Sequence, residues 1–385
     1  MIVVLIEGSN MRQRHWIASA LLLAGLAAAA PQTARPPFPV DKASDEAARF
    51  ICGLSSTSEP WKKLQETAEW KGFTERLEKS WADLDAKRLV PMRKWAEAEL
   101  VAANQETRTV FYPFGGPDLL TPLILFPQAE TYVLLGLEFV GHLPNFDKAA
   151  PGNVQAYFDD LTLALSDFIN KSYFITHNMD ATLYGDKVEG VLPLLSFFLK
   201  REGFAISSVR RVDILESGEL MESDFSAARR IRRPYGVKIE FFAEGTSRLR
   251  TVYYFSADLV DSVFQKDSPF HKWLEGLTFE TTYMKSASYL PHYKEFSNIR
   301  NLILAKSRFV LEDDTGIPFR YFPPKEWTSQ LYGEYIQPIS DFKGVEQTDL
   351  KAAYADPAQG VKPLPFHLGY HWSTSKDSVL FFRKK

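Results

Sequence analysis

Residues 109–138 read TVFYPFGGPDLLTPLILFPQAETYVLLGLE, and this stretch decides the fold. Thr109–Phe114 is typical of a strand, and Gly115-Gly116-Pro117-Asp118 is typical of a turn. Leu119–Phe126 is apolar and predicts a short helix. Thr131–Leu137 is a fully apolar run, as expected for a strand that is covered on both faces. The order strand, helix, strand within about 30 residues predicts a βαβ unit.

Strand-like and helix-like segments continue to alternate after this unit, which predicts the α/β class. We expect a Rossmann-like mixed sheet with helices on both faces. The expected strands are Ile206–Leu215, Val237–Phe242, Leu249–Phe255, Phe279–Met284, Phe319–Phe322, Gln330–Tyr335 and Val379–Phe382. The expected helices are Val154–Ile169, Val188–Arg201, Pro269–Leu274, Phe296–Leu311 and Gln347–Tyr354.

The segment before the βαβ unit is expected to be helical. Apolar side chains recur there at three- and four-residue spacing, which places one apolar stripe on each of two helices. They are Trp61, Leu64 and Ala68, then Phe73, Leu77, Trp81 and Leu84. Pro91 suits the first position of a further helix. We therefore divide the chain into a signal segment 1–30, a flexible leader 31–42, a helical region 43–105 and an α/β body 106–385.

The N-terminus has the three-part layout of a secretory signal. Arg12 and Arg14 form a short positive region, Trp16–Leu26 is apolar, and Ala27–Ala30 supplies small residues for a signal peptidase. Met11 is the expected start of translation, and cleavage is expected after Ala28 or Ala29. The alternative is an uncleaved anchor, but the apolar run is shorter than the ~20 residues that span a bilayer. The sequence predicts an exported protein, periplasmic or extracellular.

Composition excludes several classes of protein. Cys52 is the only cysteine, so neither an intrachain disulfide nor a zinc ribbon can form. The net charge is −3 and the pI is about 6.2, which gives no basic excess for nonspecific nucleic-acid binding. The cluster Arg229-Arg230-Ile231-Arg232-Arg233 is interpreted as a solvated helix end. No segment after the signal is apolar for long enough to span a membrane.

Two segments of the βαβ unit resemble sequences of known families. Val110–Asp118 and Phe126–Glu138 are similar to the first motif of Rossmann-like methyltransferases: a glycine-rich turn, a helix, a Phe-Pro-x-Ala turn and an acid that ends the second strand. The resemblance makes Gly115, Gly116 and Glu138 the candidate cofactor-binding residues, because such an acid binds ribose hydroxyls. The shorter segments Phe111–Asp118 and Tyr132–Glu138 resemble a family of uncharacterised exported bacterial proteins, which implies export and nothing about activity.

The glycine turn departs from the methyltransferase pattern at two places. Tyr112 and Pro113 replace the acid that usually precedes the glycines, and Pro117-Asp118 replaces the third small residue. Asp118 at a helix start would cap free N–H groups and would oppose a phosphate or the carboxylates near an adenosyl cofactor. We therefore expect a degenerate cofactor site, and the sequence specifies no cofactor.

Short catalytic motifs give no support for an enzyme class. Ser340–Lys343 matches Ser-x-x-Lys, but its usual partner motifs are missing. Asp314-Thr-Gly316 has the form of an aspartic protease turn, yet it follows the expected helix Phe296–Leu311, so Gly316 is interpreted as a helix cap. The pair His367 and His371 lacks an obvious third metal ligand.

The candidate catalytic residues are Asp118, His142, His177 and Asp258, and the candidate metal ligands are His177 and Asp180. An imidazole next to a carboxylate can act as a general base or bind a metal. The alternative for His177–Asp180 is a turn with local hydrogen bonds, and for Asp258 a helix cap. Asp118, Glu138, His142, His177 and Asp258 all follow expected strands, so in a parallel sheet they would share one edge.

Three functions are compatible with these residues. The first is a non-catalytic envelope protein that binds a small molecule or a partner through a degenerate Rossmann-like core. The second is an exported hydrolase, with or without a metal, that uses His177, Asp180, Asp118 and Asp258. The third is a methyltransferase.

Overall fold

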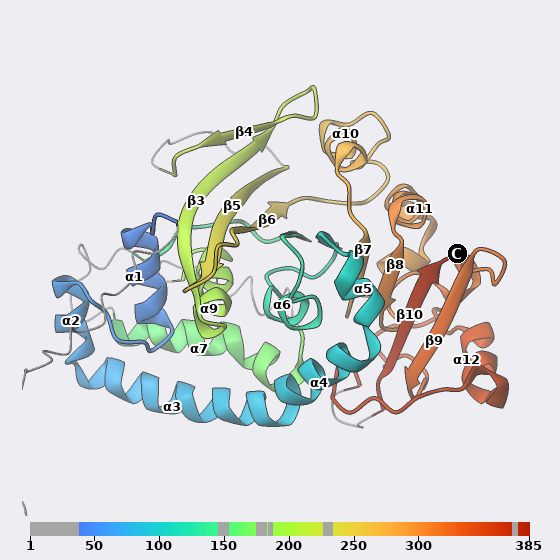
Figure 1. Cartoon of the computed structure of the whole chain (residues 1–385), viewed down its shortest axis with the longest axis horizontal. Helices are drawn as coiled ribbons and strands as arrows, with labels where there is room; N and C mark the ends of the chain where they lie inside the picture. Colours follow the sequence, from blue (N-terminus) through green and yellow to red (C-terminus); the bar gives the residue numbers. More distant parts are fainter. Residues whose placement is uncertain (1–37, 145–153, 175–182, 184–187, 226–233, 372–375) are drawn as a thin grey trace, which may run out of the picture. The chain divides into compact units, whose positions relative to one another are not determined.

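A ten-stranded sheet organises the chain, in the order β4-β3-β5-β6-β2-β1-β7-β8-β10-β9 (Figure 1). The computed structural model describes residues 38–144, 154–174, 183, 188–225, 234–371 and 376–385. The strands are β1 Thr109–Tyr112, β2 Thr131–Gly136, β3 Phe204–Ile214, β4 Leu220–Ser223, β5 Tyr235–Ala243, β6 Arg250–Ser256, β7 Thr281–Met284, β8 Phe309–Glu312, β9 Trp327–Gly333 and β10 Ser378–Lys384. The predicted α/β class with a mixed sheet is confirmed.

The centre of the sheet is parallel. β1 pairs in parallel with β2 and β7, β2 pairs in parallel with β6, and β7 pairs in parallel with β8. The resulting order β6-β2-β1-β7-β8 is the 3-2-1-4-5 order of doubly wound folds. The predicted βαβ unit is therefore present, with helix α6 (Leu120–Leu125) between β1 and β2. The chain reverses its winding direction beside β1, where such folds have their crevice.

Antiparallel strands extend the sheet at both sides. β5 pairs with β6, β3 with β5, and β4 with β3, each in antiparallel fashion. On the other side, β10 runs antiparallel to both β8 and β9. The expected hairpin of Val237–Phe242 and Leu249–Phe255 corresponds to β5 and β6.

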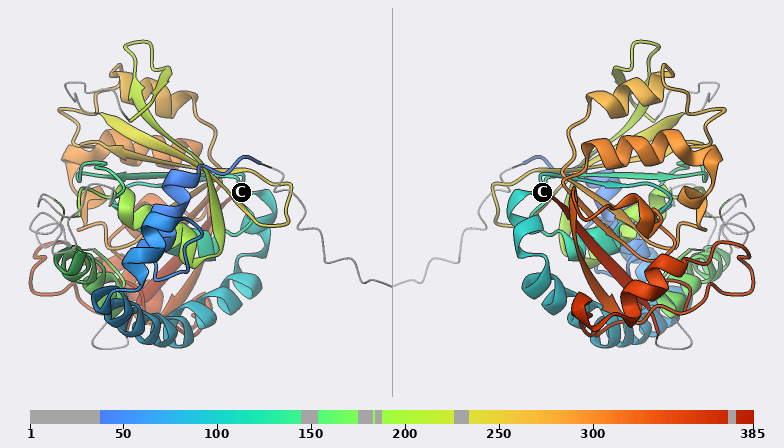
Figure 2. Two further views of the ribbon diagram at one scale, coloured as in Figure 1. Left: turned by 90° about the vertical axis from the view of Figure 1, so that its left-hand side faces the viewer. Right: turned by 90° about the vertical axis from the view of Figure 1, so that its right-hand side faces the viewer.

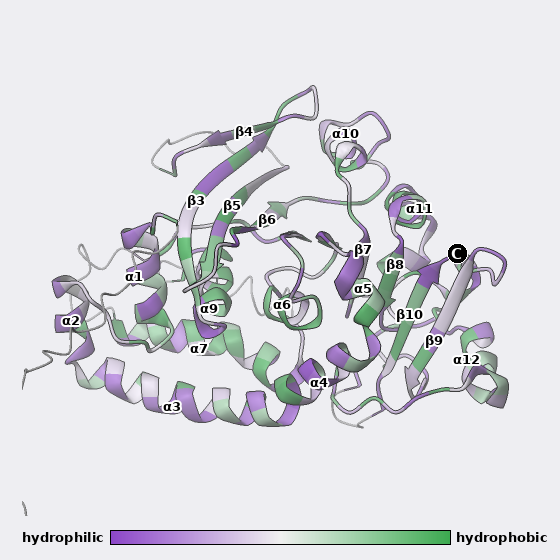
Figure 3. Ribbon diagram, viewed as in Figure 1, coloured by the Kyte–Doolittle hydropathy of each residue, from purple (hydrophilic) through white to green (hydrophobic). Residues whose placement is uncertain are grey.

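Side chains of the central strands alternate between two hydrophobic cores. Tyr132 and Leu134 of β2 point into one core, whereas Val133 and Leu135 point into the other. This alternation follows from the two-residue period of a strand, and it explains why the sequence of β2 is apolar throughout. Figure 3 shows that helix α3 alternates between hydrophobic and hydrophilic residues along its length.

Helices cover both faces of the sheet, as predicted (Figure 2). The first core is covered by α1 Lys42–Ile51, α2 Glu59–Gln65, α3 Ala68–Leu84, α4 Val90–Glu99, α5 Val101–Glu106, α6, α7 Val154–Lys171 and α9 Leu192–Arg201. The second core is covered by α10 Pro269–Gly276, α11 Ser297–Lys306 and α12 Thr348–Ala355. In the described part of the chain, no helix is both long enough and apolar enough to cross a bilayer.

Two expected elements differ from the structure. The segment Phe296–Leu311 is not one helix, because α11 ends at Lys306 and β8 begins at Phe309. Phe319–Phe322 is not a strand, since Phe319–Tyr321 forms a 3₁₀ turn. Pro91 lies in the first turn of α4, as expected, and the π-helical segment Asp85–Leu89 joins α3 to α4 without a break.

Candidate functional site

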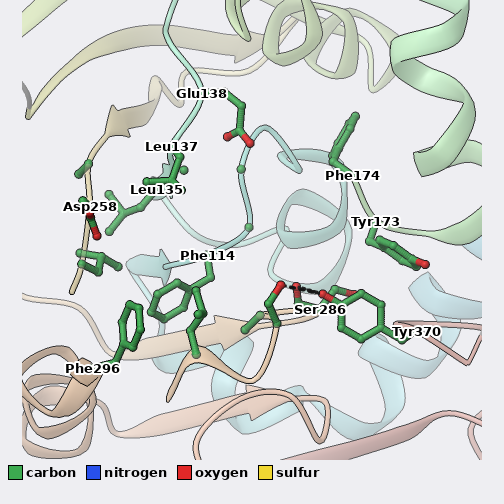
Figure 4. Close-up of a pocket in the computed structure, with 18 of the residues that line it drawn as sticks. Phe114, Leu135, Leu137, Glu138, Tyr173, Phe174, Asp258, Ser286, Phe296 and Tyr370 are labelled. Atoms are coloured by element: carbon green, nitrogen blue, oxygen red, sulfur yellow. Dashed lines mark hydrogen bonds between the residues drawn. The ribbon is translucent and has the colours of Figure 1, made fainter. Parts of the chain in front are cut away.

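A pocket of about 540 Å³ lies at the carboxyl ends of the parallel strands (Figure 4). The end of β2 and the loops after β1, β2, β6 and β7 contribute Phe114–Gly116, Leu135–Glu138, Ala257–Leu259 and Ser286–Ser288. The pocket therefore occupies the crevice of the doubly wound sheet, where ligands bind in this class of fold. We call it the rim pocket. Its other walls come from Tyr173, Phe174, Leu290, Phe296, Ile339, Asp341, Phe342 and Tyr370.

The charged side chains of the rim pocket are acidic. Glu138, Asp258 and Asp341 line it, and none of its described lining residues is Lys, Arg or His. Glu138 is buried, and the hydroxyl of Tyr254 donates to its carboxylate over 3.3 Å. Asp258 is half-buried and accepts from the backbone N–H of Val260 at 3.0 Å. Carboxylates in a partly enclosed site favour a neutral or cationic ligand over an anion.

Aromatic rings form much of the remaining wall. Phe114 packs against Phe296 on the side of Asp258, and Tyr173 packs against Tyr370 on the other side, with ring centroids 5.9 and 4.8 Å apart (Figure 4). The Tyr370 hydroxyl donates to the carbonyl of Ser286 at 2.9 Å. Flat apolar walls on two sides of a pocket suit a planar or cationic molecule, because aromatic faces attract both.

The backbone around the pocket is strained. Among the described residues, five non-glycine residues have a positive φ: Phe114, Ser172, Ser286, Ser288 and Tyr289. Each of them lines the rim pocket or is adjacent in sequence to a residue that lines it. Non-glycine residues in this region cost about 1–3 kcal/mol each and persist where the surrounding structure imposes them, typically at ligand sites. The concentration of strain at this pocket supports a functional role.

Asp313 and Thr315, which follow β8, hold the Ser286–Ser288 wall in place. The N–H of Ser286 donates to the Asp313 carboxylate at 2.8 Å, and the N–H of Ala287 donates to the Thr315 hydroxyl at 2.7 Å. Burial and the neighbouring charge of Asp314 raise the pKa of Asp313 to about 7. Sequence reasoning missed this support because it placed these residues behind a helix instead of at the end of a strand.

The glycines of the first turn serve close packing. A Cβ on Gly115 would lie 2.4 Å from the ring of Tyr112, and a Cβ on Gly136 would lie 2.9 Å from the Cα of Gly116. Gly116 has φ +55° and donates its N–H to the carbonyl of Leu135 at 3.0 Å. The turn after β1 therefore packs directly against the end of β2, and both Gly115 and Gly116 line the rim pocket.

Asp118 does not line the pocket but lies buried behind it. Its carboxylate accepts from the N–H of Thr121 at 3.1 Å in the first turn of α6 and from the Tyr112 hydroxyl at 3.1 Å. The ammonium of Lys285 lies 2.6 Å from the same carboxylate, and both side chains are 2% exposed. Burial lowers the pKa of Lys285, while the charge of Asp118 opposes that shift. Asp118 thus combines a helix cap with a buried ion pair.

The histidine candidates do not converge with the acids in the described part of the chain. His142 is 54% exposed, lies outside the rim pocket and is 4.0 Å from Glu189. His177 and Asp180 lie outside the described residues. Within the described ranges, no group of three or more His, Cys, Asp or Glu residues could hold a metal ion. The structure therefore brings together Gly115, Gly116, Glu138 and Asp258, and it places Asp118 and His142 elsewhere.

The fold and the site define a doubly wound α/β protein with an acidic, aromatic pocket at its crevice. No family model, no curated protein and no solved structure matches this chain.

Proposed function

We propose that this is an exported, non-catalytic binding protein whose rim pocket takes a neutral or cationic molecule of the nucleoside type. The observation that carries the proposal is the lining of the pocket: three carboxylates and several aromatic rings, with no cationic side chain among the described lining residues. The proposal of export rests on the N-terminal sequence alone, since residues 1–37 lie outside the described residues.

Each part of a nucleoside has a matching group in the pocket. Glu138 follows β2, the position from which an acid accepts hydrogen bonds from ribose hydroxyls in doubly wound folds. The rings of Phe114, Phe296, Tyr173 and Tyr370 offer stacking faces for a planar base. A phosphate group is disfavoured, because the described lining of the pocket carries three acids and no cationic side chain.

The same geometry gives little support for the hydrolase. Ser286 and Ser288 offer hydroxyls to the pocket, but no described lining residue is a histidine that could act as their base. Asp118 is committed to Lys285, and Asp258 accepts from a backbone N–H. Binding without catalysis is therefore the function that the described residues support best.

A methyltransferase is the second candidate, and the sheet favours it. The order β6-β2-β1-β7-β8, followed by the reversed strand β10, extends the resemblance to Rossmann-like methyltransferases from the turn to the whole sheet. The adenosyl sulfonium cofactor of such enzymes is a cationic nucleoside, so it belongs to the ligand class proposed above. Methyl transfer from it to any acceptor would replace the non-catalytic proposal.

Calorimetry with the purified mature protein tests the proposal. Adenosine and S-adenosylmethionine are expected to bind, and ATP is expected to bind at least about tenfold more weakly, because its phosphates would face the carboxylates of the pocket. Glu138→Gln should weaken adenosine binding by a similar factor, since it removes a charged acceptor. Glu75→Gln, on the exposed face of α3, is the matched control and should bind like the wild type. Equal or tighter binding of ATP, or no binding of any nucleoside, would refute the proposal.

A further inference from the structure

A second cleft, of about 830 Å³, lies at the opposite edge of the sheet. Its walls include Arg108 just before β1, Gln128 shortly before β2 and Arg250 at the start of β6. These are the amino ends of the parallel strands, whereas the rim pocket lies at their carboxyl ends. Arg93 and Arg248 complete a set of four arginines, and we call this the arginine cleft.

The carboxylates around the arginine cleft neutralise only part of this charge. Arg93 is fully paired, because its guanidinium lies 2.7 Å from Asp85 and 2.9 Å from Glu202. Arg108 and Arg248 share the single carboxylate of Glu130, at 2.7 and 3.7 Å. Two guanidinium groups therefore share one negatively charged partner.

Arg250 has no carboxylate within ion-pairing distance among the described residues. It is half-buried, and its guanidinium lies over the ring of Phe204 at 5.4 Å from the centroid. Burial lowers the pKa of Arg250, while the neighbouring Tyr132 and, more weakly, the charge of Glu130 oppose the shift. A guanidinium removed from water without a counter-charge is unfavourable, and an anion in the cleft would supply that charge.

The positive charge is concentrated on one side of the cleft. There Arg108, Arg248 and Arg250 have Glu130 as their one acid in ion-pairing contact among the described residues, which leaves a surplus of two positive charges. The opposite side, with Arg93, Asp85, Glu202 and the exposed Glu97, carries a surplus of two negative charges. The amide side chains of Asn104, Gln105 and Gln128 line the same cleft. Planar guanidinium groups bind oxyanions through two parallel hydrogen bonds, and amides add neutral donors.

We infer that the arginine cleft binds a small phosphate-type oxyanion carrying two or more negative charges, with Arg250, Arg248 and Arg108 as its ligands. The site is independent of the rim pocket, since the two share no lining residue. The absence of nucleoside binding would therefore leave this inference untouched, and its own failure would leave the nucleoside proposal untouched.

Calorimetric titration with pyrophosphate tests the arginine cleft. We expect saturable binding that weakens as sodium chloride is raised, since the contact is electrostatic. Arg250→Met keeps an apolar stem against Phe204 and should lower the affinity by about tenfold or more, the effect of losing a charged hydrogen bond. Arg76→Met removes an exposed arginine on α3 and should leave the affinity unchanged.

Arg248→Met, at a side chain 28% exposed, provides a second variant if Arg250→Met does not fold, and it should weaken pyrophosphate binding in the same direction. Citrate, a carboxylate anion of similar charge, separates phosphate selectivity from general anion binding. Three results would overturn the inference: no saturable pyrophosphate binding, unchanged affinity in whichever arginine variants fold, or binding of citrate without binding of pyrophosphate.

Discussion

The burial of Asp118 changes the role that its sequence context indicates. In the sequence it is an acid after two glycines, compatible with a helix cap or with a catalytic group. In the structure its carboxylate contacts the ammonium of Lys285 while both side chains are almost fully buried. The energetic weight of Asp118 therefore exceeds that of a cap, because its removal leaves a buried cation without a counter-charge.

Asp118→Asn is expected to lower the free energy of unfolding by about 3–5 kcal/mol, the range for breaking one partner of a buried ion pair. The Asn side chain can still accept a hydrogen bond from the N–H of Thr121. The loss of stability therefore measures the missing charge and not the loss of the cap. Chemical denaturation gives the value. Asp261→Ala removes only the cap of α11 and should cost about 1 kcal/mol. A loss in Asp118→Asn no larger than in this control would contradict the role of the pair.

Asp313 links pH to stability. Its raised pKa means that the folded protein binds this proton more tightly than the unfolded chain. The stabilisation by Asp313 is thus fully present below the unfolded pKa of about 4 and is lost as the pH rises towards 7. The buried neighbours Glu312 and Asp314 also have raised pKa values, chiefly through burial, so their effects have the same sign.

Urea unfolding of Asp313→Asn between pH 4 and 8 tests this linkage. Relative to the variant, the wild type should lose stability as the pH rises from 4 to 7, and the difference should level off above pH 7. Asp83→Asn on the exposed surface of α3 controls for the loss of one carboxylate. A wild type that gains stability over this window relative to Asp313→Asn would show that the carboxylate is favoured, not disfavoured, in the folded state.

At the scale of elements, the βαβ unit could be predicted because its signals agree with one another. The glycine turn, the apolar helix and the apolar strand all predict the same unit. The segment Phe296–Leu311 was interpreted wrongly because a four-residue strand buried on both faces has no alternation to distinguish it from the end of a helix. That one error hid Asp313 and Thr315, the residues that hold a wall of the rim pocket.

The turn after β1 should be intolerant of even one methyl group. Gly115→Ala is expected to lower the free energy of unfolding by about 1–3 kcal/mol, because its Cβ would overlap the ring of Tyr112. Gly276→Ala in α10 meets no atom within 4 Å and should be neutral or slightly stabilising. Thermal unfolding compares the two. If Gly115→Ala and Gly276→Ala were equally stable, the turn after β1 would accommodate the additional methyl group without strain, contrary to this prediction.

At the scale of the molecule, the class was predictable and the strand order was not. The burial of β2 on both faces could be predicted from its unbroken apolar run. The local sequence does not indicate that β6 and β7 pair with the strands of the βαβ unit. The aromatic walls of the rim pocket were missed for the same reason. Tyr173, Phe342 and Tyr370 come from loops far apart in sequence and carry no motif.

The proposed export concerns the whole chain and has its own test. We expect expression with the native N-terminus in a bacterium to yield a protein outside the cytoplasm that begins at Ala29 or Ala30, as read by mass spectrometry. Replacing Arg12 and Arg14 by Glu should retain the uncleaved chain in the cytoplasm, because the positive region is lost. An unprocessed wild-type chain in the cytoplasm would refute export.

The two edge strands of the sheet affect whether the protein aggregates at high concentration. β4 is only four residues long and carries Glu222, and the outward backbone of β9 already bonds to Lys362. Neither of these two edge strands presents a long row of unpaired backbone N–H and C=O groups to a neighbouring molecule. High local concentration should therefore leave the protein dispersed, without strand-by-strand growth into fibrils.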